Sequence, residues 1–350
     1  MTGSRPYPSD REKWARRLAN LSGLAGRARP PVGQTPHDCV FEENKWRLLR
    51  YRSAVAPRWR RPVLLVPSLI NRHYVMDLLP GKSLAAYLVA EGHDVFVVDW
   101  GTPGDEDRFL GFDDVAGRYL DRALRRTARI AGADRAHVLG YCLGGTLAVV
   151  HAAVQQGRIA SLALLAAPVR FEDDGPLSAW TRSATFRPDA VVRAFGNVPW
   201  QLLQGAFHMI RPTLGLSKSV ALLDRAWNDE FLDGFLALET WGHDNVSFPG
   251  ACFEKYIVEL YKRDALVKGE LRLLGRPARL SAITCPVYVV TFAHDGIVPH
   301  ESARVLLDHV TSLDKHHLHL AGGHVGAVVS RAASKGLWPA LATFFRDRDR

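Results

Sequence analysis

The sequence predicts an α/β fold with a mostly parallel central sheet, helices on both faces and an inserted helical cap. Short, uninterrupted apolar segments alternate with helical patterns in the first half of the chain and again near its C-terminus, as buried parallel strands do. Residues 170–270 show helical patterns without a clean buried strand. We therefore expect a basic N-terminal arm over residues 1–35, a core over residues 36–169 and 271–350, and a helical cap over residues 170–270.

The composition is that of a folded globular protein. The chain has 350 residues, enough for one large domain or two average ones, and 47% of them are hydrophobic. No apolar run approaches the roughly 20 residues that a membrane-spanning helix needs, and the polar N-terminus lacks the apolar centre of a secretory signal. The four cysteines have neither disulfide nor metal spacing, which favours a reducing, cytoplasmic setting. We expect no metal site.

The chain is basic, with a formal net charge of +9 at pH 7. Part of this charge lies in the N-terminal arm, at Arg5, Arg11, Lys13, Arg16, Arg17, Arg27 and Arg29. The simplest interpretation is a solvated surface, and the alternatives are a phosphate-bearing substrate or an anionic surface. The sequence contains no aromatic-basic motif or zinc spacing of a nucleic-acid module, so we expect no nucleic-acid partner.

The N-terminal arm is predicted to contain one helix. Trp14, Leu18, Leu21 and Leu24 lie four and three residues apart, so they form one apolar stripe on a helix. We expect this stripe to pack on the body of the protein, with contact to a partner or to an apolar surface as the alternative.

Strands and helices alternate along the core. Strands are expected at residues 46–51, 62–66, 94–99, 161–166, 285–291 and 316–320, and one begins at residue 136. Helices are expected at residues 83–91 and 113–130, after residue 145, and from residues 301 and 337, with Asp113 as a candidate N-cap.

The segment from Ala136 onward contains the first candidate catalytic residue. A short apolar run ends in Gly-Tyr-Cys-Leu-Gly-Gly at residues 140–145, and a helical pattern follows. This is the form of a nucleophile elbow with Cys142 in place of the usual serine. Side chains at Gly140 and Gly144 would collide with the adjoining strand and helix. The alternative is that Cys142 is a small buried apolar residue.

Two further residues complete a candidate triad. Asp295 and His324 each follow a predicted strand and lie next to glycine. The order cysteine, aspartate, histidine is the nucleophile, acid and base order of the α/β-hydrolase fold, and side chains beyond the carboxyl ends of parallel strands can meet. Alone, Asp295 could stabilise a turn, and His324 could be one of many surface histidines, since the chain has 14 histidines.

A triad for acyl transfer also needs donors for the oxyanion. In this fold they are the backbone N–H after the nucleophile, here Leu143, and one from the loop after the third strand. That loop is predicted at residues 67–74, where Ile70 or Asn71 would supply the second N–H. For each residue, an ordinary turn is the alternative.

These motifs resemble those of the polyhydroxyalkanoate synthases. Residues 140–145 match the cysteine elbow of that family, and residues 295–299 and 323–326 match its acid and histidine motifs. Further similar segments lie at residues 69–77, 97–101 and 261–270. The short N-terminal arm resembles the small synthases that work with a second, non-catalytic subunit, whereas residues 243–250 look more like the cap of the longer, self-sufficient synthases.

The resemblance implies an acyltransferase that polymerises (R)-3-hydroxyacyl-CoA into polyhydroxyalkanoate and releases CoA. It implies no cofactor, since CoA belongs to the substrate. The partners it implies are the growing polyester or its granule surface, a second synthase subunit, and further copies of the chain in a homo-oligomer. A role for Asp295 in helping His324 to activate the 3-hydroxyl of the incoming unit also comes from the resemblance.

Cysteine suits this chemistry. A thiolate that attacks a thioester forms another thioester of nearly equal free energy, so the acyl group on Cys142 stays activated for transfer to an alcohol. Imidazolium next to the thiol lowers its pKa from about 8.5. His324 would accept the proton from Cys142, and Asp295 would orient His324. Two alternatives remain: a hydrolase acting as a thioesterase, esterase or polyester depolymerase, and a non-catalytic protein associated with granules.

Overall fold

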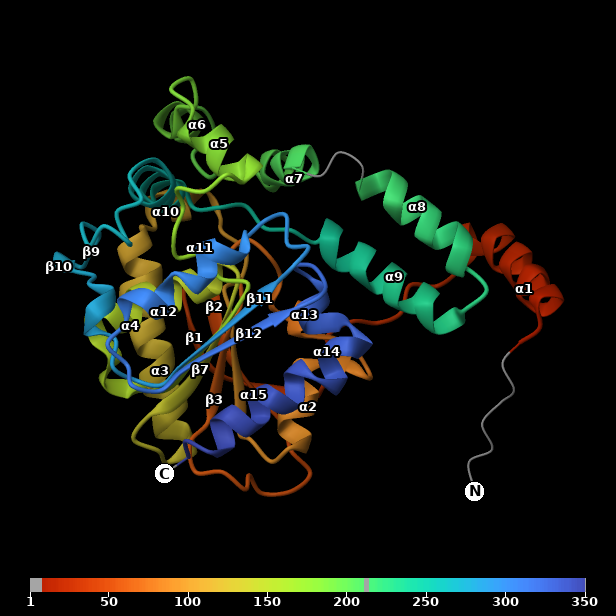
Figure 1. The fold of residues 1–350 in the computed structure, drawn as a ribbon, viewed down its shortest axis with the longest axis horizontal. Helices are drawn as coiled ribbons and strands as arrows, with labels where there is room; N and C mark the ends of the chain where they lie inside the picture. Colours follow the sequence, from red (N-terminus) through yellow and green to blue (C-terminus); the bar gives the residue numbers. More distant parts are fainter. Residues whose placement is uncertain (1–7, 211–213, 350) are drawn as a thin grey trace.

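The computed structural model describes residues 8–210 and 214–349 and shows a central sheet flanked by helices (Figure 1). The sheet has eight strands in the order β1-β2-β6-β3-β7-β8-β11-β12. The strands are β1 (His37–Glu43), β2 (Trp46–Tyr51), β3 (Val63–Val66), β6 (Val95–Asp99), β7 (Ala136–Tyr141), β8 (Ile159–Leu165), β11 (Val287–Phe292) and β12 (Lys315–Leu320). From β6 to β12 all neighbours are parallel, whereas β2 pairs antiparallel with both β1 and β6. The predicted mostly parallel sheet is confirmed.

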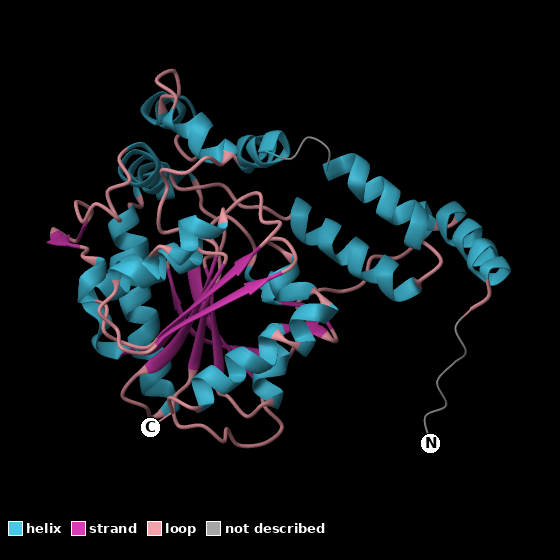
Figure 2. Cartoon of the chain, in the orientation of Figure 1, coloured by secondary structure: helices cyan, strands magenta, loops and turns pink. Residues whose placement is uncertain are grey.

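Helices cover both faces of the sheet and bury two apolar clusters (Figure 2). One face packs against α3 (Leu120–Ala131) and α4 (Leu143–Gln155), and the other packs against α2 (Leu84–Ala90) and α15 (Leu337–Arg346). The inner strands β3, β6, β7, β8 and β11 are buried on both faces because their side chains alternate between the two clusters: Leu64 and Val66 lie in the first, and Val63 and Leu65 in the second.

The remaining regular elements are short. Beside the sheet lie α11 (His300–Arg304), α12 (Leu306–His309), α13 (Gly326–Val329) and α14 (Arg331–Lys335). Two small hairpins are β4 (Asp77–Leu79) with β5 (Lys82–Ser83), and β9 (Arg272–Leu273) with β10 (Arg276–Pro277). Single 3₁₀ turns are η1 (Leu24–Gly26), η2 (His73–Met76), η3 (Asp105–Phe109), η5 (Gln156–Arg158) and η7 (Leu280–Ala282).

The chain between β8 and β9 is helical. Its helices are α5 (Pro176–Arg182), α6 (Pro188–Phe195), α7 (Trp200–Ile210), α8 (Leu214–Arg225), α9 (Asp229–His243), α10 (Gly250–Lys255) and the π-helix η6 (Tyr256–Lys262). Figure 1 shows α5, α6, α7 and α10 above one end of the sheet, while α8 and α9 extend to one side. The first group therefore lies over the end where β7, β11 and β12 finish.

Most predicted elements are confirmed, with strand ends that differ by two residues at most. The helix predicted at residues 113–130 is the main correction. Its first turns, Asp113–Tyr119, form the π-helix η4, and α3 begins only at Leu120. The candidate N-cap Asp113 does not cap it, and its carboxylate instead accepts a hydrogen bond from Lys255. Strand β1 was not predicted.

The N-terminal helix α1 (Asp10–Ser22) packs through polar side chains rather than through the whole predicted stripe. Arg17 and Asn20 donate hydrogen bonds to backbone carbonyls at the end of α8 and just beyond it. Trp14 and Leu18 are 59% and 63% exposed. The prediction that the stripe packs on the body is therefore wrong for Trp14 and Leu18, whereas Leu21 and Leu24 are partly buried. Arg5 of the predicted basic arm lies outside the described residues. In the described part of the chain, no helix has both the length and the apolar character to cross a membrane.

Candidate active site

Cys142 lies in a strained turn between β7 and α4. Its backbone has φ 52° and ψ −130°, a conformation that residues other than glycine rarely adopt. The turn is held on both sides: the Cys142 N–H donates to Leu165 O at 3.0 Å, and its carbonyl accepts from Gly145 N at 2.9 Å. Tertiary contacts therefore fix a conformation that the cysteine alone would not favour.

The glycines around Cys142 have a steric reason, as the sequence predicted. A Cβ on Gly140 would lie 2.4 Å from the Cα of Gly145, and a Cβ on Gly144 would lie 2.1 Å from the carbonyl oxygen of Val66. A Cβ at Gly145 would meet Ala167 at 2.3 Å. Helix α4 therefore starts against the ends of the neighbouring strands with no space for a side chain.

The structure brings Cys142, Asp295 and His324 together. His324 Nδ1 is hydrogen-bonded to Asp295 Oδ2 at 2.8 Å, and Cys142 lies near enough to His324 to raise the pKa of the imidazole. The other oxygen of Asp295 accepts from the backbone N–H groups of Ile297 and Val298, each at 2.9 Å. The Asp295 side chain is 1% exposed and that of His324 is 9% exposed. This is the connectivity of a nucleophile, a base and an orienting acid.

The charges within this group favour a protonated histidine. Burial by itself would lower the pKa of His324, but the charge of Cys142 as a thiolate and the hydrogen bond to Asp295 raise the pKa to about 10. Burial would likewise raise the pKa of Asp295, yet His324 and the two backbone N–H groups lower it. The ionised Asp295 therefore stabilises the protonated form of His324.

Tyr141 is a site residue that sequence reasoning missed. Its ring lies 5.3 Å from the His324 ring, and its buried hydroxyl donates to the His324 carbonyl at 3.3 Å. Tyr141 therefore contacts both the ring and the backbone of His324 and restricts its position. Its position directly before the cysteine was the only signal in the sequence.

Leu143 and Ile70 both lie at the cavity that Cys142 faces. Leu143 is the first residue of α4, so its N–H is one of the first four that lack an acceptor within the helix. The Ile70 carbonyl accepts from the backbone N–H of Val246 at 3.4 Å. The neighbouring Asn71 side chain instead donates to Asn245 at 2.7 Å. An oxyanion role for Leu143 and Ile70 remains a prediction.

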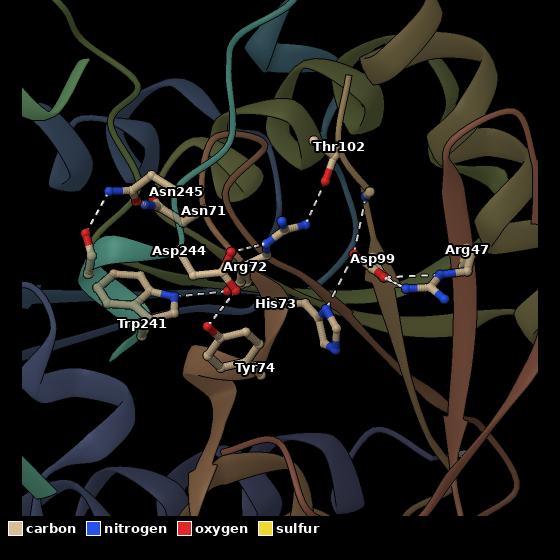
Figure 3. Close-up of polar contacts among 12 residues, drawn as sticks. Arg47, Asn71, Arg72, His73, Tyr74, Asp99, Thr102, Trp241, Asp244 and Asn245 are labelled. Atoms are coloured by element: carbon tan, nitrogen blue, oxygen red, sulfur yellow. Dashed lines mark hydrogen bonds and ion pairs between the residues drawn. The ribbon is translucent and has the colours of Figure 1, made fainter. Parts of the chain in front are cut away.

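The loop that includes Ile70 is held by the end of helix α9 (Figure 3). Asp244 accepts from Arg72 Nε at 2.9 Å and from the Tyr74 hydroxyl at 2.8 Å. Trp241 donates its indole N–H to the Arg72 carbonyl at 3.0 Å. Residues 243–250 stood out in the sequence only by their resemblance to a known family. In the structure, three of them, Asp244, Asn245 and Val246, contact the loop after β3 and hold it in place.

A second set of contacts, on the right in Figure 3, holds the same loop. His73 Nδ1 lies 3.3 Å from a carboxylate oxygen of Asp99, and Arg47 donates to the other oxygen. Burial alone would raise the pKa of Asp99, but His73 and Arg47 hold it far below its ordinary value. Trp100 donates its indole N–H to the Pro67 carbonyl at 3.0 Å. Segment 97–101 therefore supports the loop after β3.

A cavity of about 500 Å³ opens from Cys142 into the helices above the sheet. Its wall is mostly aliphatic and aromatic, with Leu177, Trp180, Leu203, Phe248, Phe253, Tyr256, Ile257 and Tyr261 among the lining residues. Within residues 8–210 and 214–349, no acidic or basic side chain lines it. The cavity therefore suits an uncharged acyl chain and disfavours water.

Two family models match the chain. Residues 29–88 match the family described as "Poly-beta-hydroxybutyrate polymerase (PhaC) N-terminus", and residues 61–328 match the family described as "alpha/beta hydrolase fold". Together they span the loop after β3, the elbow and the positions of Asp295 and His324.

Two relatives and one solved structure illustrate the similarity. The chain is 34% identical to the poly(3-hydroxyalkanoate) polymerase subunit PhaC of Haloferax mediterranei, over 91% of this chain and 65% of that protein. It is 32% identical to the protein of the same name from Allochromatium vinosum, over 91% of this chain and 90% of the relative. A soluble variant of the Saccharomyces cerevisiae monoglyceride lipase has a TM-score of 0.57 at 14% identity, covering 92% of this chain and 97% of the lipase, which shows the fold alone. The chain therefore belongs to the poly(3-hydroxyalkanoate) polymerase PhaC family, within the α/β-hydrolase superfamily.

Proposed function

We propose that the chain polymerises (R)-3-hydroxyacyl units from their CoA thioesters into polyhydroxyalkanoate, through a thioester on Cys142. The observation that supports this most directly is the position of Cys142, beside the His324–Asp295 pair and at one end of an apolar cavity. The polymerase names of the relatives support the same reaction. The chain spans 65% of the length of the Haloferax relative, so the activity of that whole protein comes to this chain as a proposal.

In the acylation step, the Cys142 thiolate attacks the thioester carbonyl of the substrate. The proton of Cys142 resides on His324, which the ionised Asp295 stabilises. The N–H groups of Leu143 and Ile70 stabilise the oxyanion, and removing one such donor typically costs on the order of 10² to 10³ in rate. The C–S bond to CoA then breaks, and His324 returns the proton to the departing thiolate. One thioester replaces another at nearly equal free energy.

In the elongation step, a 3-hydroxyl attacks the acyl group on Cys142. His324 accepts the proton of the hydroxyl, with Asp295 assisting, and Cys142 leaves as a thiolate. General-base assistance of this kind contributes roughly 10²- to 10⁴-fold. Because an ester forms at the expense of a thioester, the step is downhill. Attack by water is downhill too, so the product depends on which nucleophile reaches the acyl group.

The apolar wall of the cavity favours the alcohol over water. Water admitted to Cys142 would hydrolyse the acyl-enzyme and turn the polymerase into a thioesterase. Residues from α5, α7 and η6 line the cavity, so these helices exclude solvent from the acylated cysteine.

The proposal extends to the partners of the chain. The short N-terminal arm, with its exposed Trp14 and Leu18, supports contact with a polyester granule surface or with a second, non-catalytic synthase subunit. We also propose a cytoplasmic location at such granules and self-association into a homo-oligomer.

Incubation with (R)-3-hydroxybutyryl-CoA tests the function. CoA release is measured together with the form of the product, by chromatography of the CoA and chloroform extraction of the polymer. The proposal predicts CoA release with polymer, which is abolished in Cys142→Ala and unchanged in Cys39→Ala, whose cysteine is exposed and remote in sequence. CoA release with free 3-hydroxybutyrate alone would favour the hydrolase. No release from any acyl-CoA, with or without a candidate partner subunit, would refute both enzymatic functions for this substrate class.

A further inference from the structure

We propose that His300, His317 and His319 form a binding site for a divalent transition-metal ion of the zinc class, outside the acyl cavity. His317 and His319 lie two residues apart on the edge strand β12, so their side chains point to the same face. His300 is the first residue of α11. None of the three lines the cavity at Cys142.

The three imidazoles converge on one buried hydroxyl. His300 Nδ1, His317 Nε2 and His319 Nδ1 lie 2.8, 3.0 and 2.9 Å from Thr291 Oγ1. These nitrogens lie within 4.8 Å of one another. In a tetrahedral zinc site, ligand nitrogens about 2.0–2.1 Å from the ion lie roughly 3.4 Å apart. Small rotations of the rings close that gap, because His317 and His319 are exposed and free of surrounding packing on the solvent side.

Three hydrogen bonds use the full bonding capacity of the Thr291 hydroxyl. A hydroxyl donates one proton and offers two lone pairs, so three ring nitrogens exhaust its capacity. Two of the imidazoles must then donate N–H, and only one can accept. A metal ion removes this constraint, since all three nitrogens then present lone pairs to one cation.

The surroundings favour the neutral form of His300 and His317, and a carboxylate lies next to His300. Burial and the neighbouring His319 lower the pKa of His300, and burial together with His300 and His319 lowers that of His317. Neutral imidazole is the form that binds metal. The far nitrogen of His300, Nε2, lies 3.3 Å from Glu301 Oε1, the arrangement in which a carboxylate orients a ligating histidine. Glu301 also pairs with Arg304, which balances its charge.

The donor set indicates the type of ion. Imidazole suits zinc, copper and nickel, whereas magnesium and calcium prefer oxygen ligands. Three histidines leave the fourth position of a tetrahedral ion to water. The cysteine spacing predicted no metal site. The three histidines come together only in the folded chain, where β12 and α11 both contact β11.

The site would join strand β12 to helix α11, close to the segments that carry the triad. Thr291 pairs with His319 in the parallel register of β11 and β12. Asp295 follows β11, and His324 follows β12. An ion bound by His300, His317 and His319 would therefore cross-link the edge strand β12 to helix α11, which follows Asp295, and it would stabilise the folded chain increasingly as its concentration rises.

Calorimetric titration of the tag-free, chelator-treated chain with ZnCl₂ tests the site. A Cys142→Ser background removes the active-site thiol as a competing ligand, and Co²⁺ absorption in the visible range reports tetrahedral coordination. We expect one equivalent of zinc and a higher melting temperature with zinc present. His317→Ala and His319→Ala should each weaken binding by about tenfold or more, and Glu301→Gln by roughly tenfold.

His316→Ala is the matched control, since His316 lies on the same strand but contacts Tyr288 and Phe344 on its other face. It should keep the affinity of the background protein. His317→Gln replaces His317→Ala if the alanine variant melts early. Absence of zinc binding up to millimolar concentration, or equal affinity in the His317, His319 and background proteins, would overturn the proposal.

Discussion

Asp244→Asn should slow catalysis without unfolding the chain, because Asp244 holds the loop that includes Ile70. The substitution removes the charge that pairs with Arg72 at 2.9 Å and weakens the hydrogen bond from Tyr74 at 2.8 Å. The Asp244 side chain is 43% exposed, so the ion pair contributes at most about 1 kcal/mol. A hydrogen bond to a charged group contributes about 1.5 kcal/mol or more, and part of it survives with an amide. The loss is therefore about 1–2 kcal/mol.

If the lost free energy is the energy that holds the Ile70 N–H in position in the transition state, kcat should fall roughly 5- to 30-fold, since about 1.4 kcal/mol corresponds to a factor of ten. KM should change little. The assay is the initial rate of CoA release from 3-hydroxybutyryl-CoA over a range of concentrations. Asp189→Asn is the control, because Asp189 also pairs with arginines, but these are Arg187 and Arg193 in and beside α6 and not residues of the loop after β3. An unchanged kcat in a folded Asp244→Asn variant, or a change in KM alone, would refute the positioning role.

Three further predictions follow from the same geometry. Asp295→Asn should leave acylation of Cys142 partly intact but slow elongation about 10²-fold or more, measured by rapid quench; equal loss in both steps would contradict the second role of Asp295. Gly144→Ala, whose Cβ would lie 2.1 Å from a carbonyl oxygen, should lower the free energy of unfolding by about 3 kcal/mol in urea titrations, while Gly157→Ala, with no atom in reach, should be nearly neutral. The pKa of Asp99 is lower in the folded chain than the ordinary value of about 3.9. The ionised carboxylate therefore stabilises the fold at pH values above about 3.9, and this stabilisation is lost as the pH falls further. Asp99→Asn should thus cost about 1–3 kcal/mol at pH 7, and a cost that persists undiminished below pH 4 would be inconsistent with this linkage.

The central sheet and the three catalytic candidates were predictable because both leave strong local patterns. Buried parallel strands are continuous apolar runs, and five of the eight strands, β3, β6, β7, β8 and β11, are buried along their whole length. Strand β1 escaped prediction because it is an edge strand with only partial burial, and its sequence mixes charged and apolar residues. Cys142, Asp295 and His324 were recognisable because each follows a strand beside glycine.

Contacts between distant segments could not be predicted. Helical periodicity in α1 suggested that Trp14 and Leu18 face the body, but the contact with the end of α8 uses Arg17 and Asn20, so the face that packs is polar. The bonds from Asp244 to the loop after β3 join residues about 170 apart in the sequence. No periodicity reports such pairs. The π-helical start of residues 113–130 also leaves no hydropathy signal, because an apolar helix face looks similar in both helix types.

The most direct test of the account is the mass of the enzyme during turnover. The chain is mixed with (R)-3-hydroxybutyryl-CoA, quenched in acid within the first turnovers, digested and analysed by mass spectrometry. We predict one or more hydroxybutyryl units on the peptide that contains Cys142, a label that hydroxylamine removes and that Cys142→Ala lacks. Turnover at the normal rate with no acyl group on Cys142, or with an acyl group on another residue, would contradict the thioester mechanism.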